Sequence, residues 1–211
     1  MWVKICGVKK VEDVEAVVSA GADAVGFVLE SSSPRFVSLD ELPPLIEKAS
    51  GIEKVAVLTA SALDELSGGD FSSFFEKLRG IGIDTVQFHG FGDMELAGKA
   101  LSSGLRVIRA FVYREESNVL DPESLKDWLS FRIMLDSGCG SGETFDWTLA
   151  KKFVDSGYRV ILSGGLTPEN VAEAVKKVSP FGVDVSSGVE SSPGVKDPEK
   201  IRSFVASAKK I

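Results

Sequence analysis

Two side chains that can exchange protons each end an apolar run in this sequence. Cys6 ends the first run, and Asp136 directly follows the run at 133–135. A deprotonated thiol is a nucleophile and a base, and a carboxyl group can donate or accept a proton. Each residue also has a structural interpretation, because a lone buried cysteine packs as a small hydrophobe and an aspartate can cap a helix or form a turn.

Two glycine-containing segments could hold an oxyanion. Gly164 and Gly165 follow one apolar run, and Ser186, Ser187 and Gly188 follow the next one. Glycine lets backbone N–H groups approach an anion closely, and the N-terminus of a helix adds positive potential. The alternative is a pair of tight turns that bind nothing.

Arg35 and His89 are two further candidates for a binding site. Arg35 follows Ser33 and Pro34, and its planar guanidinium suits a carboxylate or a phosphate, although a solvated surface arginine has the same sequence pattern. His89 is the only histidine and ends another apolar run. A lone histidine is more often structural, so we do not assign it a direct chemical role.

These candidates fall at the ends of segments that alternate between strand-like and helix-like patterns. Short continuous apolar runs are typical of strands buried on both faces. Eight such runs span residues 2–6, 23–28, 54–58, 84–88, 105–110, 131–135, 159–162 and 182–185. Helical patterns between them are clearest at 11–20, at 168–178 after a Thr167 cap, and from Pro198 after Asp197. Segment 61–80 is less regular, because Gly68 and Gly69 interrupt it.

Eight strand–helix units favour a closed barrel. Gly21, Gly82 and Gly182 each begin the same motif, a glycine, any residue, an aspartate and a short strand, although such a turn is common by itself. Eight units in 211 residues match a small (β/α)8 TIM barrel of the α/β class, formed as a single domain over residues 1–211. A doubly wound open sheet has fewer strands, and residues 7–9 carry no dinucleotide fingerprint.

A barrel would bring the candidate residues to one face. Active sites of this fold lie at the C-terminal ends of the strands, and the loops after strands 7 and 8 recurrently bind phosphate. The sequence therefore predicts a phosphate-binding pocket that contains the thiol of Cys6 and the carboxyl group of Asp136.

The composition limits the partners of this chain. A net charge of −7 argues against nucleic acid as the main partner. No apolar run approaches the roughly 18 residues of a membrane span, and charged residues interrupt the N-terminus too early for a secretory leader, so we expect no membrane partner and a cytoplasmic location. Two cysteines without a CxxC motif predict neither a disulfide framework nor a metal site. The sequence leaves a monomer and a homodimer equally open.

Seven short motifs, each weak alone, follow one another in a characteristic order. They are Lys4-Ile5-Cys6-Gly7, Gly21-Ala22-Asp23-Ala24-Val25-Gly26-Phe27, Ser33-Pro34-Arg35, Val86-Gln87-Phe88-His89-Gly90, Leu135-Asp136 with Thr144-Phe145-Asp146-Trp147, Ser163-Gly164-Gly165-Leu166, and Gly182-Val183-Asp184-Val185-Ser186-Ser187-Gly188-Val189-Glu190. Over essentially the whole chain, this series resembles the phosphoribosylanthranilate isomerase family of tryptophan biosynthesis.

The resemblance implies an Amadori rearrangement without cofactor or metal. Asp136 matches the general acid that protonates the furanose ring oxygen, and Cys6 matches the general base that removes the C2 proton. At neutral pH a free thiol, with a pKa of about 8.5, and a free aspartate, at about 3.9, both rest in the wrong form for these roles. Lys4 shares a strand face with Cys6 and could lower the pKa of the thiol if that face points inward.

The resemblance also assigns binding roles. Arg35 would hold the anthranilate carboxylate, and the loops at 164–165 and 186–188 would hold the phosphate of a small phosphosugar substrate. His89 and Asp184 match further positions of the pocket.

Two other functions remain possible on the same residues. A phosphosugar isomerase of histidine biosynthesis would be expected to use paired aspartates, which Cys6 argues against. A noncatalytic phosphate-ligand binder would keep both glycine loops but would not need Cys6 with Asp136. Between Asp136 and Thr144 the chain carries a second thiol, Cys139, and an acid, Glu143, whereas members of the family that it resembles often have a basic or neutral residue near that position.

Overall fold

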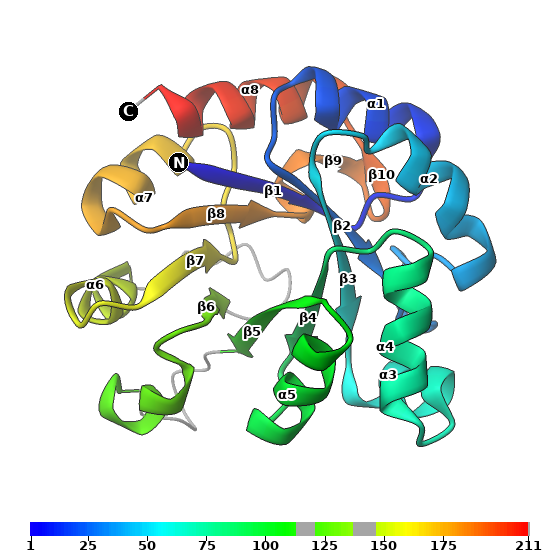
Figure 1. The fold of residues 1–211 in the computed structure, drawn as a ribbon. Coiled ribbons are helices and arrows are strands. Elements are labelled where there is room, and N and C mark those ends of the chain that lie inside the picture. The colour runs from blue at the N-terminus through cyan, green and yellow to red at the C-terminus, as the bar shows by residue number, and fades with distance from the viewer. Residues whose placement is uncertain (113–120, 137–146, 211) are drawn as a thin grey trace.

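A computed structural model describes residues 1–112, 121–136 and 147–210 of the chain (Figure 1). The segment with Cys139 and Glu143, together with Thr144, Phe145 and Asp146 of the family motif, lies outside the described residues.

Eight parallel strands close into a barrel in sequence order, which confirms the predicted fold class. The strands are β1 (Trp2–Cys6), β2 (Ala24–Val28), β3 (Glu53–Leu58), β4 (Thr85–His89), β5 (Arg106–Val112), β6 (Arg132–Asp136), β7 (Arg159–Ser163) and β8 (Gly182–Val185). The barrel closes where β1 pairs with β8, and this pairing sets Lys4 opposite Asp184. Every predicted strand is present, with ends that differ by at most two residues.

Helices surround the barrel, as Figure 1 shows. They are α1 (Val11–Ser19), α2 (Leu42–Lys48), α3 (Ala60–Ser67), α4 (Phe71–Gly80), α5 (Met94–Ser102), α6 (Trp147–Asp155), α7 (Val171–Val178) and α8 (Pro198–Lys209), with 3₁₀ turns at η1 (Leu39–Glu41), η2 (Glu123–Trp128) and η3 (Ser187–Val189). The last helix, α8, lies beside the first, α1, so the two ends of the chain share one side of the barrel. Within the described residues no helix is both long and apolar enough to cross a membrane.

Two helical segments differ from the sequence prediction. Segment 61–80 forms two helices, because Gly68 ends α3 in the left-handed conformation and the Asp70 side chain caps α4 by accepting from the backbone of Ser73. The regular helix expected from Pro168 begins only at Val171, but Thr167 caps the turn before it, because its hydroxyl accepts from the backbone N–H of Glu169 at 3.3 Å. The side-chain oxygen of Asn170 accepts from the backbone N–H of Thr167 at 2.8 Å, which completes a reciprocal cap of this turn.

A short antiparallel hairpin follows the barrel and was not predicted. It consists of β9 (Glu190–Ser192) and β10 (Val195–Lys196), and it lies between β8 and α8. Its three- and two-residue strands are too short to give a periodic signal in the sequence.

The barrel has an apolar layer between strands and helices and a second, smaller core inside the lumen. Six buried side chains form the inner core: Ala24, Val55, Ile108, Ala110, Met134 and Ile161. Alternation along each strand sends every second residue into the lumen, so polar residues on that face must find partners there.

An ion pair closes the end of the barrel at which the strands begin. The Arg132 guanidinium donates to both carboxylate oxygens of Glu53, at 2.9 and 2.6 Å. Arg106 approaches the same carboxylate at 3.2 Å, and Thr85 donates to it. Burial alone would raise the pKa of Glu53, but the hydrogen bonds and charge of Arg132 outweigh it and lower that pKa.

We expect Arg132→Met to destabilise the barrel without impairing the opposite face. Removing one partner of a buried pair costs about 3 kcal/mol of unfolding free energy at neutral pH. Because the folded-state pKa of Glu53 lies below its unfolded value, the pair stabilises above pH of about 4.3 and loses its contribution as the pH falls through the folded pKa.

Urea denaturation at several pH values measures this effect. The difference between wild type and Arg132→Met should shrink in acid, and Glu53→Gln/Arg132→Met should recover much of the lost stability. A difference that does not change with pH would contradict this assignment.

Candidate active site

One cavity of about 360 Å³ opens at the C-terminal ends of the strands. Its wall includes all ten residues that the sequence analysis selected: Cys6, Arg35, His89, Asp136, Gly164, Gly165, Asp184, Ser186, Ser187 and Gly188. Gln87 and Ser163, to which no role was assigned, also line it. The fold thus gathers the predicted site into a single pocket.

Lys4 points into the lumen and is fully buried beneath Cys6. Its ammonium donates to Oδ1 of Asp184 at 2.7 Å, and its side chain lies beside the Cys6 sulfur. Two-residue alternation along β1 places both side chains on the inner face, which answers the question that the sequence left open. The thiol therefore lies against a buried cation.

Gly26 makes room for this arrangement. It pairs with Cys6 across β1 and β2, and a Cβ atom at this position would lie 2.9 Å from both the Cys6 sulfur and Cε of Lys4. That is closer than real Cβ contacts. The glycine in the Gly21–Phe27 motif is thus explained by the space that the Lys4 and Cys6 side chains need.

Burial and charge act in opposite directions on Cys6. Burial raises the pKa of the Cys6 thiol above its ordinary value, the Lys4 ammonium offsets part of that rise, and the Asp184 carboxylate adds to it. For Lys4, burial alone would lower the pKa, but the charges of Asp184 and Cys6 outweigh it and raise that pKa. Lys4 is therefore a persistent cation beside a thiol that ionises late.

Asp136 lies across the pocket from this pair and connects to it through Ser163. The Ser163 hydroxyl lies 3.5 Å from Oδ2 of Asp136 and 3.3 Å from Oδ2 of Asp184. A hydroxyl has one proton to donate, so it serves one carboxylate at a time. The sequence analysis included Ser163 only as part of the motif with Gly164 and Gly165 and gave it no role of its own.

The two glycine loops touch one another. A Cβ atom on Gly188 would overlap the carbonyl oxygen of Leu166, so only glycine permits this approach of the two backbones. The Asn170 amide donates to the carbonyl oxygen of Gly165 at 2.9 Å and fixes the first loop. The loops after β7 and β8 therefore form one continuous rim of the cavity.

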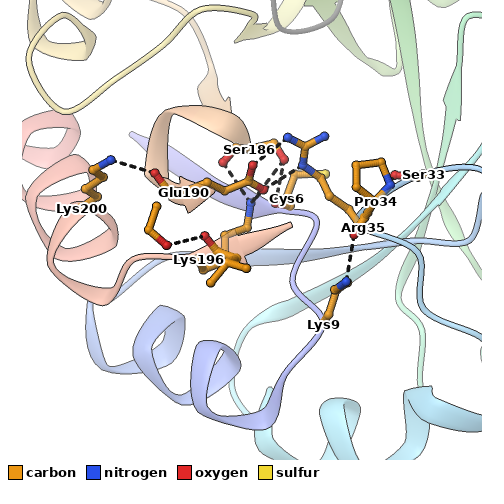
Figure 2. Close-up of polar contacts among 11 residues, drawn as sticks. Cys6, Lys9, Ser33, Pro34, Arg35, Ser186, Glu190, Lys196 and Lys200 are labelled. Carbon is orange, nitrogen blue, oxygen red and sulfur yellow. Dashed lines mark hydrogen bonds and ion pairs between the residues drawn. The ribbon is translucent and has the colours of Figure 1, made fainter. Parts of the chain in front are cut away.

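Arg35 forms a two-point ion pair with Glu190 of the hairpin (Figure 2). Its Nε and Nη2 donate to the two carboxylate oxygens at 2.8 and 2.7 Å. Lys196, whose side chain is fully buried, donates to the same carboxylate at 2.8 Å and to the carbonyl oxygen of Ser186 at 2.9 Å. Glu190 and Lys196 thus connect Arg35 to the loop after β8.

Among the described residues, no group of three or more His, Cys, Asp or Glu side chains is placed to hold a metal ion. His89 ends β4 and lines the cavity as a half-buried side chain.

Comparison with known proteins decides the family. The family model for N-(5'-phosphoribosyl)anthranilate (PRA) isomerase matches residues 3–207. This chain belongs to the PRA isomerase family.

Relatives and solved structures agree over the full length. The PRA isomerase of Aquifex aeolicus (strain VF5) is 38% identical over 215 residues, with 98% of each chain covered. The crystal structure of the Thermotoga maritima enzyme has a TM-score of 0.85, 36% identity and complete coverage of both chains. A PRA isomerase in complex with reduced 1-(o-carboxyphenylamino)-1-deoxyribulose 5-phosphate has a TM-score of 0.83, 35% identity and complete coverage of both chains.

In this member of the PRA isomerase family, a titration of the Cys6 thiol tests whether the Lys4 ammonium lowers its pKa. We expect Lys4→Met to move thiolate formation at Cys6 upward by about one pH unit or more, because the opposing cation is lost. The thiolate absorbance, recorded against pH in a Cys139→Ser background, reports this shift.

A control addresses the Asp184 carboxylate that Lys4→Met leaves unpaired. Lys4→Met/Asp184→Asn removes both charges and should show a smaller upward shift, since Asp184 itself raises the pKa of Cys6. An unchanged or lower thiol titration in Lys4→Met would refute the role of the ammonium.

Proposed function

We propose that this protein converts N-(5-phosphoribosyl)anthranilate to 1-(2-carboxyphenylamino)-1-deoxyribulose 5-phosphate in tryptophan biosynthesis. The observation that carries the proposal is a thiol beside a buried ammonium, facing a carboxyl group in a pocket that also holds an arginine and two joined glycine loops. Membership of the PRA isomerase family supports it, as does the complex of a related enzyme with a reduced phosphosugar.

Asp136 starts the reaction as a general acid. Its proton passes to the ring oxygen of the ribose as the bond from C1 to that oxygen breaks. The lone pair of the anthranilate nitrogen forms a double bond to C1, which gives a protonated Schiff base. Ser163 hydrogen-bonds with the Asp136 carboxyl group and orients it.

Cys6 completes the isomerisation as a general base. Its thiolate takes the proton from C2, and the electrons of that C–H bond form a double bond between C1 and C2 while the nitrogen recovers its lone pair. The resulting enolamine becomes the ketone when C1 gains a proton and the C2 hydroxyl loses one. Because burial raises the pKa of Cys6, we expect turnover to increase with pH as the thiolate fraction grows.

The two ends of the substrate are bound by different parts of the pocket. Arg35 would hold the anthranilate carboxylate through charge-assisted hydrogen bonds, and the loops at 164–165 and 186–188 would hold the phosphate through backbone N–H groups. His89 and Asp184 complete the wall.

We further propose that a single domain over residues 1–211 acts on this small molecule in the cytoplasm, without nucleic acid or membrane partners.

Loss of substrate fluorescence tests the reaction, with the labile phosphoribosylanthranilate generated in situ. Wild type should consume it, and Cys6→Ser and Asp136→Asn should each lose at least about 100-fold in kcat, the lower range for general acid–base groups. Each variant should retain the wild-type thermal midpoint to within a few degrees.

Cys139→Ser is the matched thiol control and should retain turnover, because the proposed chemistry uses one thiol. Wild-type kinetics in Cys6→Ser would eliminate Cys6 as the base. No turnover by folded wild type, together with binding of phosphate ligands, would favour the noncatalytic binder, and the histidine-pathway substrate would then be tested.

Glu190→Gln tests whether the ion pair positions Arg35 for the substrate carboxylate. Burial would raise the pKa of Glu190, but Arg35 and Lys196 outweigh it and lower that pKa, so the group is a carboxylate at neutral pH. Glutamine keeps one acceptor oxygen of the two-point contact but loses the other and the charge, so KM should rise about tenfold with a smaller change in kcat, as expected for one lost charge-assisted hydrogen bond.

A double-mutant cycle separates positioning from general damage. In an Arg35→Met background, Glu190→Gln should raise KM no further, because its effect acts through the missing guanidinium. Equal, additive losses in both backgrounds would show that Glu190 does not act through Arg35.

A further inference from the structure

Gln87 is a polar residue buried in the floor of the cavity. It lies two residues before His89 on the inner face of β4, so it lies deeper in the barrel than the strand end. Gln87 is only 2% exposed, but it lines the pocket. Its register partners on the adjacent strands, Val57 and Ile108, are apolar.

The Gln87 amide is poorly satisfied by the protein. Its nitrogen lies 3.5 Å from the sulfur of Met134, which is a weak acceptor. Its oxygen, Oε1, is buried and has no hydrogen-bond partner among the residues that the structure describes.

The other buried side chains with nitrogen or oxygen atoms at this site have partners. Lys4 pairs with Asp184, and Ser163 bonds with Asp184 and Asp136. In the described part of the chain, Oε1 of Gln87 is the single buried side-chain nitrogen or oxygen without a partner. Buried polar groups are hydrogen-bonded as a rule, so an unmatched amide on a residue that lines a cavity points to a ligand.

We propose that the side-chain amide of Gln87 forms a hydrogen bond with a hydroxyl of the bound phosphosugar. This inference rests on the proposed function for the identity of the sugar. Charged ends of the substrate are matched elsewhere, by Arg35 and by the glycine loops. A neutral amide beside apolar neighbours suits a neutral partner, since a charged group would be costly to bury there, and the sugar hydroxyls are the neutral polar groups that such a ligand carries.

Gln87→Met is the variant that tests this role. Methionine has nearly the same length and volume but no strong hydrogen-bonding group. If the amide serves the ligand, the variant should keep or raise the thermal midpoint, because an unmatched buried amide is removed. Its kcat/KM should fall about tenfold, the effect of one lost hydrogen bond. A structural role would instead lower the midpoint.

Two simple ligands separate sugar recognition from phosphate recognition. By calorimetry, Gln87→Met should bind ribose 5-phosphate about 5- to 10-fold more weakly than wild type. Inorganic phosphate, which offers no sugar hydroxyl, should bind both proteins with the same affinity. Equal affinity of both proteins for ribose 5-phosphate would overturn the proposal.

Ile108→Val is the matched control, because it removes one methyl group from the same buried layer and does not line the cavity. It should lower the thermal midpoint slightly and leave kcat/KM and ribose 5-phosphate affinity unchanged. If Gln87→Met instead lowered both the thermal midpoint and kcat/KM, the role of Gln87 would be structural. Absence of turnover in wild type would refute the proposed function, whereas the ribose 5-phosphate comparison would still decide the role of Gln87.

Discussion

The buried contact between Lys4 and Asp184 is the constraint on which the rest of the site depends. It joins side chains 180 positions apart in sequence, at the seam where β1 and β8 close the barrel. A charge at this depth requires a partner of opposite sign, so closure of the fold and ionisation of the site are linked. Cys6 lies two residues further along the same face of β1, so the strand holds its thiol next to the cation, which lowers the pKa of the thiol.

The residues that stabilise the barrel and the residues of the candidate site lie at opposite ends of its axis. At the end where the strands begin, Glu53 and Arg132 form an ion pair that closes the lumen. At the other end, Ser163 shares one hydroxyl between two carboxylates and Gln87 holds an amide without a strong partner. Satisfied polar groups stabilise the protein, and incompletely satisfied ones are available to a ligand.

The hairpin after β8 extends this network to the rim. Glu190 lies between Arg35 and Lys196, and Lys196 also donates to the backbone of Ser186 (Figure 2). One carboxylate therefore fixes an arginine of the cavity wall and, through the lysine, the neighbouring loop after β8. The two regions proposed to hold the anionic ends of the substrate share a single buried charge cluster.

The sequence by itself determined the eight strands, their order and the residues at their ends, because a buried parallel strand needs a continuous apolar run and a barrel brings every strand end to one face. It also determined that Lys4 and Cys6 share a face. Only the tertiary structure decided which face points inward, that Asp184 neutralises Lys4, that Glu190 pairs with Arg35, and that Gln87 lacks a partner. Periodicity constrains neighbours along one strand, whereas these contacts join distant segments whose distances are set by barrel closure and strand register.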